Sequence, residues 1–479
     1  MKNRISVASP HSLSADGLSV VLRYWPCAPN RCRIPTSPAS RPPLNGHNSS
    51  HQSVTGSPPR KLPMSGRPLP LIVLALLTTL LTGCVMPPLA DASAMAPAAE
   101  EEAKRFAALP DPVDGSFNAV LVHGGEVAAG GWDHAHNEGR LYLERTVEGV
   151  ATAHVENVTD DVTRESVLRD LADKGFDLII TTSFGFMDAT ATVAQEFPNQ
   201  GFVNVSGQQS NDTNYASLFG AMEASKYLAG MVAGARAAED GSYRVGYLAT
   251  VPVPEIVRLG NALALGMRRT CPDCVMDLHW LMSWDDPEAE AVAVASMLDA
   301  GITVIASATS APLPLLLGDG RSFMYIPDKR ASACEDAPDA CLTATYWRWG
   351  PAYVLIVQDM MDGTLLSGNH YYGFPEDMLG IYGFMEGQVP QPTVPDWVVP
   401  EVRAVLQAMQ SGEFTHFDIF TGPIRDNQGN LVVPAGVSLT QSDLEGIAPE
   451  LGTHLGRPGC TICMHWLAEG FAPNAVIPE

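Results

Sequence analysis

Short apolar runs alternate with amphipathic runs from residue 117 to residue 307, and this alternation constrains the fold most strongly. The apolar runs "FNAVLVH", "FDLIITT" and "ITVIASA" have strand length, and the longer runs between them carry apolar residues at helical spacing. Such alternation is typical of βαβ units, in which parallel strands are covered by helices. Because the rhythm starts again at "YRVGYLAT", the sequence predicts an α/β chain with two lobes, each a doubly wound parallel sheet.

The predicted boundaries follow from these runs. We expect lobe 1 at residues 116–240, lobe 2 at 241–345, and a C-terminal segment at 346–479 that crosses back between the lobes and ends in a hairpin and a tail. Within them, "SLFGAMEASKYLAGMVAGARA" predicts one long helix, "YWRWGPAYVLIVQDMMDG" a second helix, and "FTGPIRDNQGNLVVPAG" a hairpin.

The N-terminal part differs in composition from the rest. Residues 1–63 are rich in Pro and Ser and show no sustained periodicity, so we interpret them as a disordered leader or an over-extended reading frame that should start at Met64. Residues 64–84 hold an apolar run that is too short to span a membrane and that ends in "LTGC", which predicts a secretory signal. Residues 85–115, rich in Ala, Pro and acids, are expected to form a tether.

The ending "LTGC" resembles a bacterial lipobox, the signal at which a cysteine thiol is diacylated and the chain is cut just before it. It predicts a lipid anchor on Cys84, the alternative being an ordinary signal peptide with a chance cysteine. The formal net charge of −24, from 53 acidic and 29 basic residues, argues against nucleic-acid binding.

Six cysteines remain after Cys84, in three close pairs. An even number in an exported chain favours disulfides. Zinc binding by "CPDC" and "CTIC", or reduced and redox-active pairs, are the alternatives. The disulfide candidates are Cys271, Cys274, Cys334, Cys341, Cys460 and Cys463.

Motifs for catalysis are missing from the sequence. It contains no G-x-x-x-x-G-K-[ST], no H-E-x-x-H and no G-x-S-x-G, and nothing in it calls for a cofactor. His134 and His136 resemble a metal pair, but they open a predicted helix, where side chains two apart point about 200° apart. We therefore expect no metal, with His136 facing the ligand and His134 facing solvent. A metal-dependent hydrolase or nucleosidase that uses both histidines is the alternative.

Large rings occupy three junctions between a predicted strand and the following helix. Trp132, Phe184 and Trp284 stand where parallel sheets bind ligands, and stacked rings with a few carboxylates suit a purine. The alternative is that these rings pack between the lobes. The carboxylates that could accept hydrogen bonds from purine N–H groups are Asp188, Asp285 and Asp328.

The segments "GGWDHAHNEG", "IITTSFGFMDATATVAQEFP", "YLAGMVAG", "VGYLATVPVPEIVRLGNALALGMR", "SWDDPEAE", "RWGPAY" and "MHWLAEG" resemble, in order, the BMP family (basic membrane lipoproteins). These are substrate-binding lipoproteins of ABC transporters, with purine-nucleoside and adenine binders among them. The resemblance implies the type I periplasmic-binding fold, an extracytoplasmic location, and separate permease and ATPase chains as partners. A ligand sensor that docks to a receptor kinase is the alternative.

The resemblance also assigns roles to residues. It implies that Trp132 and Trp284 sandwich a nucleobase, that Phe184 and Asp188 line the site, and that Asp328 is the nearest match to a family aspartate. The first loop departs from the pattern of nucleoside binders, because "HGGEVAAGG" offers only the acid Glu126. That departure favours a free base over a nucleoside.

Overall fold

A computed structural model describes residues 109–159, 161–284, 286–309, 324–326, 333–364, 366–446 and 459–478. The predicted leader, the signal segment with Cys84 and most of the tether lie outside the described residues, as do Asp285 and Asp328. In the described part, no helix is both long enough and apolar enough to cross a membrane.

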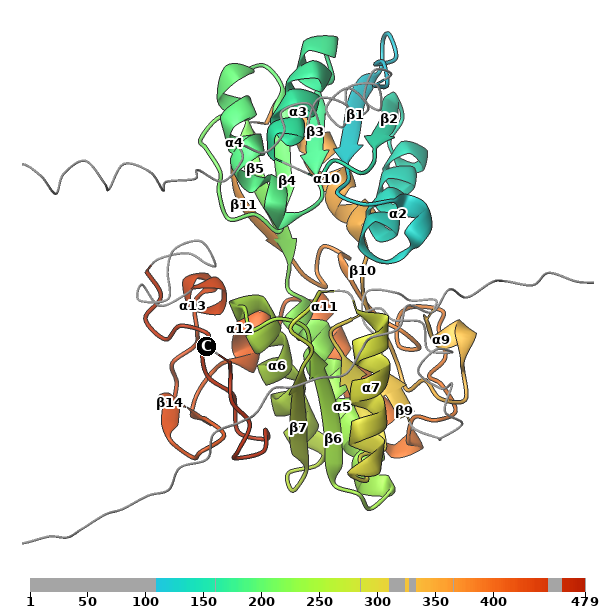
Figure 1. The fold of residues 1–479 in the computed structure, drawn as a ribbon, viewed down its shortest axis with the longest axis vertical. Helices are drawn as coiled ribbons and strands as arrows, with labels where there is room; N and C mark the ends of the chain where they lie inside the picture. Colours follow the sequence, from blue (N-terminus) through green and yellow to red (C-terminus); the bar gives the residue numbers. More distant parts are fainter. Residues whose placement is uncertain are drawn as a thin grey trace, which may run out of the picture. The chain divides into compact units, whose positions relative to one another are not determined.

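Six parallel strands form the first sheet, in the order β11-β5-β4-β3-β1-β2 (Figure 1). The strands are β1 (Phe117–Val122), β2 (Val150–Val155), β3 (Leu178–Thr181), β4 (Gly201–Val205), β5 (Tyr215–Gly220) and β11 (Gly368–Tyr372). The helices associated with this sheet are α2 (Gly131–Thr146), α3 (Asp161–Lys174), α4 (Met187–Glu196) and α10 (Trp349–Met361).

Both faces of this sheet are buried, which explains the continuous apolar runs of its strands. Val120 and Val122 of β1 point into a cluster with side chains of α3 and α4. Ala119 and Leu121 point to the opposite face, into a cluster with side chains of α2 and α10. Successive residues of a strand alternate between faces, so one apolar run supplies both cores.

Four parallel strands form the second sheet, in the order β7-β6-β8-β9. They are β6 (Arg244–Ala249), β7 (Val275–Trp280), β8 (Val304–Ser307) and β9 (Met324–Ile326). The helices beside them are α5 (Met222–Glu239), α6 (Pro254–Thr270), α7 (Pro287–Asp299) and the short α9 (Ala333–Asp336). Side chains of α5 and α6 cover one face, and side chains of α7 share a core with Leu248 and Ile305 on the other.

The close packing of α5 on α6 depends on glycine. A Cβ atom added to Gly230 would lie 2.1 Å from the Leu263 carbonyl oxygen, and one added to Gly266 would lie 1.9 Å from that of Tyr227. Only a residue without a side chain allows the two backbones to approach this closely. The helix α5 therefore belongs with the second sheet, although the boundary expected at residue 240 grouped it with the first.

Two predicted helices begin later than expected. The run "SLFG" was expected to open a long helix, but it forms the end of β5, and the helix begins at Met222. Likewise Tyr346 and Trp347 belong to the strand β10 (Thr345–Trp347), and the helix α10 begins at Trp349. Both predictions were wrong because strand pairing with distant residues, on β11 and on β12 (Leu379–Ile381), overrides local pattern.

Three connections pass from one sheet to the other. They follow β5, precede α10, and follow β11. Backbone hydrogen bonds tie them together: the Ala221 N–H donates to the Tyr372 carbonyl at 2.8 Å, and the Arg348 N–H donates to the Met378 carbonyl at 2.7 Å. The Arg348 side chain also pairs with Asp377. The three connections therefore form one hydrogen-bonded bundle rather than three free linkers.

The C-terminal segment packs mainly on α5 and α6, which cover one face of the second sheet. Its elements are η3 (Asp396–Val398), α11 (Val399–Gln410), α12 (His416–Ile419), β13 (Ile424–Arg425), β14 (Leu431–Val433) and α13 (Gln441–Glu445). The predicted hairpin is confirmed as the antiparallel pair β13 and β14. The tail reaches β7, where Phe471 bridges Met276 and the Trp280 indole donates to the Val476 carbonyl at 2.9 Å.

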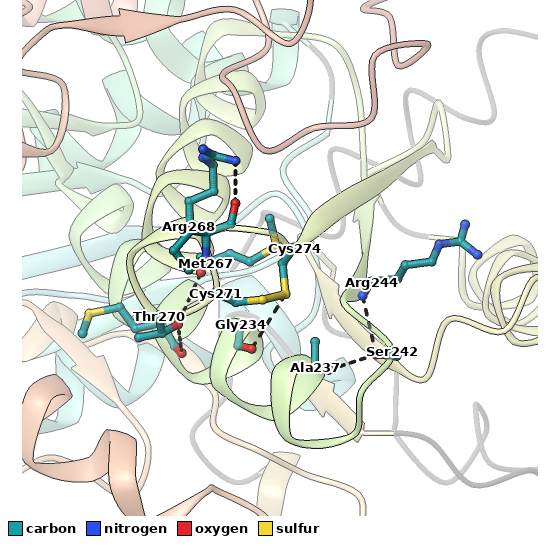
Figure 2. The surroundings of a disulfide bond; sticks show 11 residues. Gly234, Ala237, Ser242, Arg244, Met267, Arg268, Thr270, Cys271 and Cys274 are labelled. Carbon is teal, nitrogen blue, oxygen red and sulfur yellow. Dashed lines mark hydrogen bonds between the residues drawn. A yellow bond between two sulfur atoms is a disulfide. The ribbon is translucent and has the colours of Figure 1, made fainter.

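Disulfides join the cysteines in the three close pairs, Cys271 with Cys274, Cys334 with Cys341, and Cys460 with Cys463. Figure 2 shows the first of these at the end of α6, beside Gly234 of α5. Cys271 and Cys274 are both buried. The pair thus fastens the turn that leaves α6 and enters β7.

Candidate functional site

The carboxyl ends of β1 and β3 lie side by side, because the two strands are neighbours in the first sheet. After β1 the chain makes the short 3₁₀ helix η1 (Val127–Ala129) and then turns into α2. Gly130 and Gly131 have φ values of 83° and 66°, which glycine adopts without strain. This turn places Trp132 in the first turn of α2, next to the end of β3.

Trp132 is held in place by a hydrogen bond and by two other rings. Its indole N–H donates to the backbone carbonyl of Thr182, the residue that follows β3. Its ring meets His136 edge to face at a centroid distance of 4.6 Å and Trp349 at 5.4 Å. The indole is half-buried, so part of it stays accessible while the rest is fixed by its neighbours.

His136 lies behind Trp132 and is fully buried. Its imidazole stacks on Trp349 at 4.2 Å with an interplanar angle of 28°, and its Nδ1 lies 2.5 Å from the Tyr353 hydroxyl. Burial, and then the nearby His123, hold the pKa of His136 well below its usual range. Burial also raises the pKa of Tyr353. The hydroxyl therefore stays protonated, the imidazole stays neutral, and the two groups share a hydrogen bond. His136 supports Trp132 from within the α2–α10 interface.

A second polar group lies beneath the first loop. His123, which follows β1, is fully buried, and its Nδ1 lies 3.2 Å from the Thr182 hydroxyl and 3.4 Å from an Asp133 carboxylate oxygen. The Asp133 side chain is 17% exposed and also approaches Gly125, where an added Cβ would lie 2.7 Å from its Oδ2. This group ties the first loop, the start of α2 and the end of β3 together.

Phe184 and Asp188 follow β3. Phe184 lies in the 3₁₀ helix η2 (Phe184–Phe186) and is 40% exposed, whereas its neighbour Phe186 is fully buried. Asp188 is exposed in the first turn of α4, and its Oδ1 accepts a hydrogen bond from the Gln209 side chain at 2.8 Å. Phe184 and Trp132 thus stand at adjacent strand ends, and both offer ring surface.

Trp284 follows β7 on the second sheet. Its side chain is 49% exposed, and it stands just before α7, whose N-cap is Asp286. The Asp286 carboxylate accepts a hydrogen bond from the Ala289 N–H at 2.9 Å, which fixes the start of that helix. Trp284 is therefore an exposed ring next to a firmly capped helix.

The two histidines of "HAH" point into different environments. His134 is exposed, whereas His136, which the sequence predicted to face the ligand, is instead fully buried against Trp132, Trp349 and Tyr353. Among the described residues, no three His, Cys, Asp or Glu side chains gather in a way that could hold a metal ion. The geometry of α2 thus separates the two imidazoles, as residues two apart on a helix require.

The sequence did not single out His123, Trp349 and Tyr353, which support Trp132 directly or through Thr182 and His136. His123 is a polar residue at the end of an apolar strand, and that position was a signal for a site residue. Trp349 and Tyr353 lie more than two hundred residues from Trp132, and only the packing of α10 on α2 reveals their part.

A family model for PnrA-like substrate-binding proteins of ABC transporters matches residues 117–403, which is more than half of the chain. The chain belongs to the Bmp family. Its members bind substrates for ABC transporters, which confirms the resemblance found in the sequence.

Curated relatives support this assignment. A purine-binding protein of Brucella abortus is 30% identical over 318 residues, which are 66% of this chain and 87% of that protein. A protein of Haloferax volcanii, whose name proposes glucose binding for an ABC transporter, is 26% identical over 70% of this chain and 82% of its own length.

A solved structure supports the fold. An ABC-transporter solute-binding protein from Conexibacter woesei shares 20% identity at a TM-score of 0.52, and the match covers 63% of this chain and 98% of that one. With its two parallel sheets, the chain thus has the predicted periplasmic-binding-protein fold.

Proposed function

We propose that this Bmp-family protein binds a purine, as a free base or a nucleoside, between Trp132 of the first lobe and Trp284 of the second. The observation that carries the proposal is the half-buried indole of Trp132, fixed by Thr182, His136 and Trp349 with part of its surface accessible. A fixed ring loses little freedom when it stacks on a flat ligand, so binding costs less entropy.

The second lobe supplies the other half of the proposed site. Trp284 offers an exposed ring. Asp285 and Asp328, which lie outside the described residues, remain proposed hydrogen-bond acceptors. Phe184 and Asp188 would line the first lobe's side of the ligand. Stacking would supply affinity for any flat base, and the carboxylates would select among bases through their N–H groups.

The relative from Brucella abortus supports a purine over other flat ligands, because it is named as a purine-binding protein. We further propose that Cys84 carries a lipid that holds the protein on the outer side of a membrane. There it would deliver the purine to a permease driven by a separate ATPase. The protein would perform no chemistry. Closure of the lobes around the ligand would produce the form that the permease recognises.

Isothermal titration of the purified protein tests the proposal, with adenine, adenosine, guanosine, inosine and glucose as ligands. The protein is first unfolded and refolded so that carried-over ligand is removed. We expect tight binding of one purine with a stoichiometry of one and no heat from glucose. Binding of glucose alone would reject the purine. Stoichiometric zinc with turnover of a nucleoside would reject the binding protein and favour the hydrolase that uses His134 and His136.

A further inference from the structure

A pocket lies beside the connections between the sheets, and the rings of Trp132, Phe184 and Trp284 do not line it. Its volume is about 190 Å³. Three segments line it: the start of α5, the end of β11 with the turn that follows, and the stretch from the end of α11 to α12. The last of these comes after residue 403, where the family match ends, so one wall belongs to the C-terminal segment of this chain.

The walls of this pocket are mainly apolar and aromatic. Rings come from Tyr371, Phe374, Phe414 and Phe417, and Met409 adds a flexible apolar side chain. The Glu376 carboxylate lies at the pocket but already accepts a hydrogen bond from the Gly373 N–H at 2.7 Å. Such a lining favours a flat apolar ligand over a charged one.

The size of the pocket narrows the class of ligand further. An apolar protein cavity of about 150 Å³ is enough to bind benzene. A pocket of about 190 Å³ therefore has room for a compound of one or two rings. We propose that this pocket is a second ligand site, which takes a small aromatic compound such as indole or phenol.

Contacts around the pocket indicate that its walls are fixed before a ligand enters. The Tyr371 hydroxyl donates to the Glu223 carboxylate, whose two oxygens lie 3.0 and 3.1 Å away. Glu223 is fully buried and pairs with the buried Arg258 at 3.4 Å. On its other side Tyr371 meets His416 of α12 at a centroid distance of 5.3 Å. A preformed wall lowers the cost of ordering on binding.

The pocket also adjoins a series of rings that starts at the proposed purine site. Consecutive ring centroids in this series lie between 5.0 and 6.3 Å apart. The series runs through Trp132, Trp349, Trp347, Phe219, Tyr371 and His416. An aromatic ligand in the pocket would extend this series by one ring, and edge-to-face or offset contacts at these distances are favourable.

Titration with indole, followed by calorimetry and by the NMR signal of the Met409 methyl group, tests the proposal. Two variants fill the pocket. Ala224→Leu adds bulk at the first turn of α5. Gly373→Val starts from a position where a Cβ meets nothing closer than 3.4 Å. Ala238→Leu is the matched control, since it makes the same change on the same helix at a half-buried position that does not line the pocket.

We expect one indole per chain, a shift of the Met409 methyl signal, and at least a tenfold loss of affinity in both filling variants. Ala238→Leu should bind like the parent, and so should Trp132→Ala, because the proposed purine site is separate. If one filling variant does not fold, the other variant and the Met409 signal decide. The absence of saturable binding, an unmoved Met409 signal, or binding lost in Trp132→Ala but kept in the filling variants would overturn the second site. None of these outcomes depends on purine binding.

Discussion

Trp132 follows an inner strand of the first sheet and Trp284 follows an edge strand of the second, and the surroundings of the two rings differ as well. Trp132 is half-buried, donates a hydrogen bond to Thr182, and contacts two further rings. Trp284 is 49% exposed and precedes a capped helix. We propose that the two rings act differently in binding. Trp132 offers a ring surface that is already ordered, whereas Trp284 becomes buried only when ligand is bound.

The largest effect is expected from Trp132→Ala. Loss of a stacked ring typically costs about 1–3 kcal/mol per base, and here the partner rings would also lose their packing. We expect purine affinity to fall about 100-fold and the free energy of unfolding to fall by about 2–4 kcal/mol. Calorimetry and chemical denaturation measure the two effects. Retained purine affinity in a folded Trp132→Ala protein would show that the ordered indole of the first lobe does not bind the ligand.

His136→Ala should destabilise the protein next most strongly. It removes a fully buried ring that stacks on Trp349 and shares a hydrogen bond with Tyr353, so we expect a loss of about 2–3 kcal/mol in the free energy of unfolding. Purine affinity should fall about tenfold, because Trp132 loses its support. His134→Ala is the matched control at an exposed position two residues away, and it should change neither quantity. Equal effects of the two variants would favour a shared metal instead.

Trp284→Ala should lower purine affinity about tenfold and leave the free energy of unfolding nearly unchanged. An exposed ring contributes little to folding, whereas stacking on the ligand is worth about 1–3 kcal/mol. Trp397→Ala provides the control, since Trp397 is 51% exposed and lies outside the proposed site. A Trp284→Ala protein that is markedly less stable would show that this ring packs in the free protein too.

The last expected effect is on stability alone, as a dependence of the free energy of unfolding on pH. The pKa of His136 is lowered in the folded protein, so below about pH 6.5 the unfolded chain binds a proton that the folded chain does not. The contribution is present above pH 6.5 and is lost as the pH falls, at up to about 1.4 kcal/mol for each pH unit. Thermal unfolding between pH 7 and pH 5 should therefore show a smaller decline in His136→Phe than in the parent. An identical decline in the two proteins would show that protonation of another group, and not of His136, causes the pH dependence.

Much of this fold could be predicted because local patterns and tertiary contacts agree. The apolar runs that predict β1, β3 and β8 are buried on both faces of their sheets, and the predicted hairpin forms as β13 and β14. Prediction failed where pairing with a distant strand decided the outcome, as at Tyr346 and Trp347. Part of the candidate site could likewise be predicted from the sequence, and part could not. Trp132 stands out at its junction in the sequence, but the rings that hold it come from α10, far along the chain.

A crystal structure of the protein with its tightest-binding purine would show directly whether the base binds between Trp132 and Trp284. We predict that the base is stacked between the indoles of Trp132 and Trp284, with the Trp132 N–H still donating to the Thr182 carbonyl and Trp284 buried by the ligand. A base bound elsewhere, or one that contacts Trp132 while Trp284 remains in solvent, would contradict the proposed sandwich.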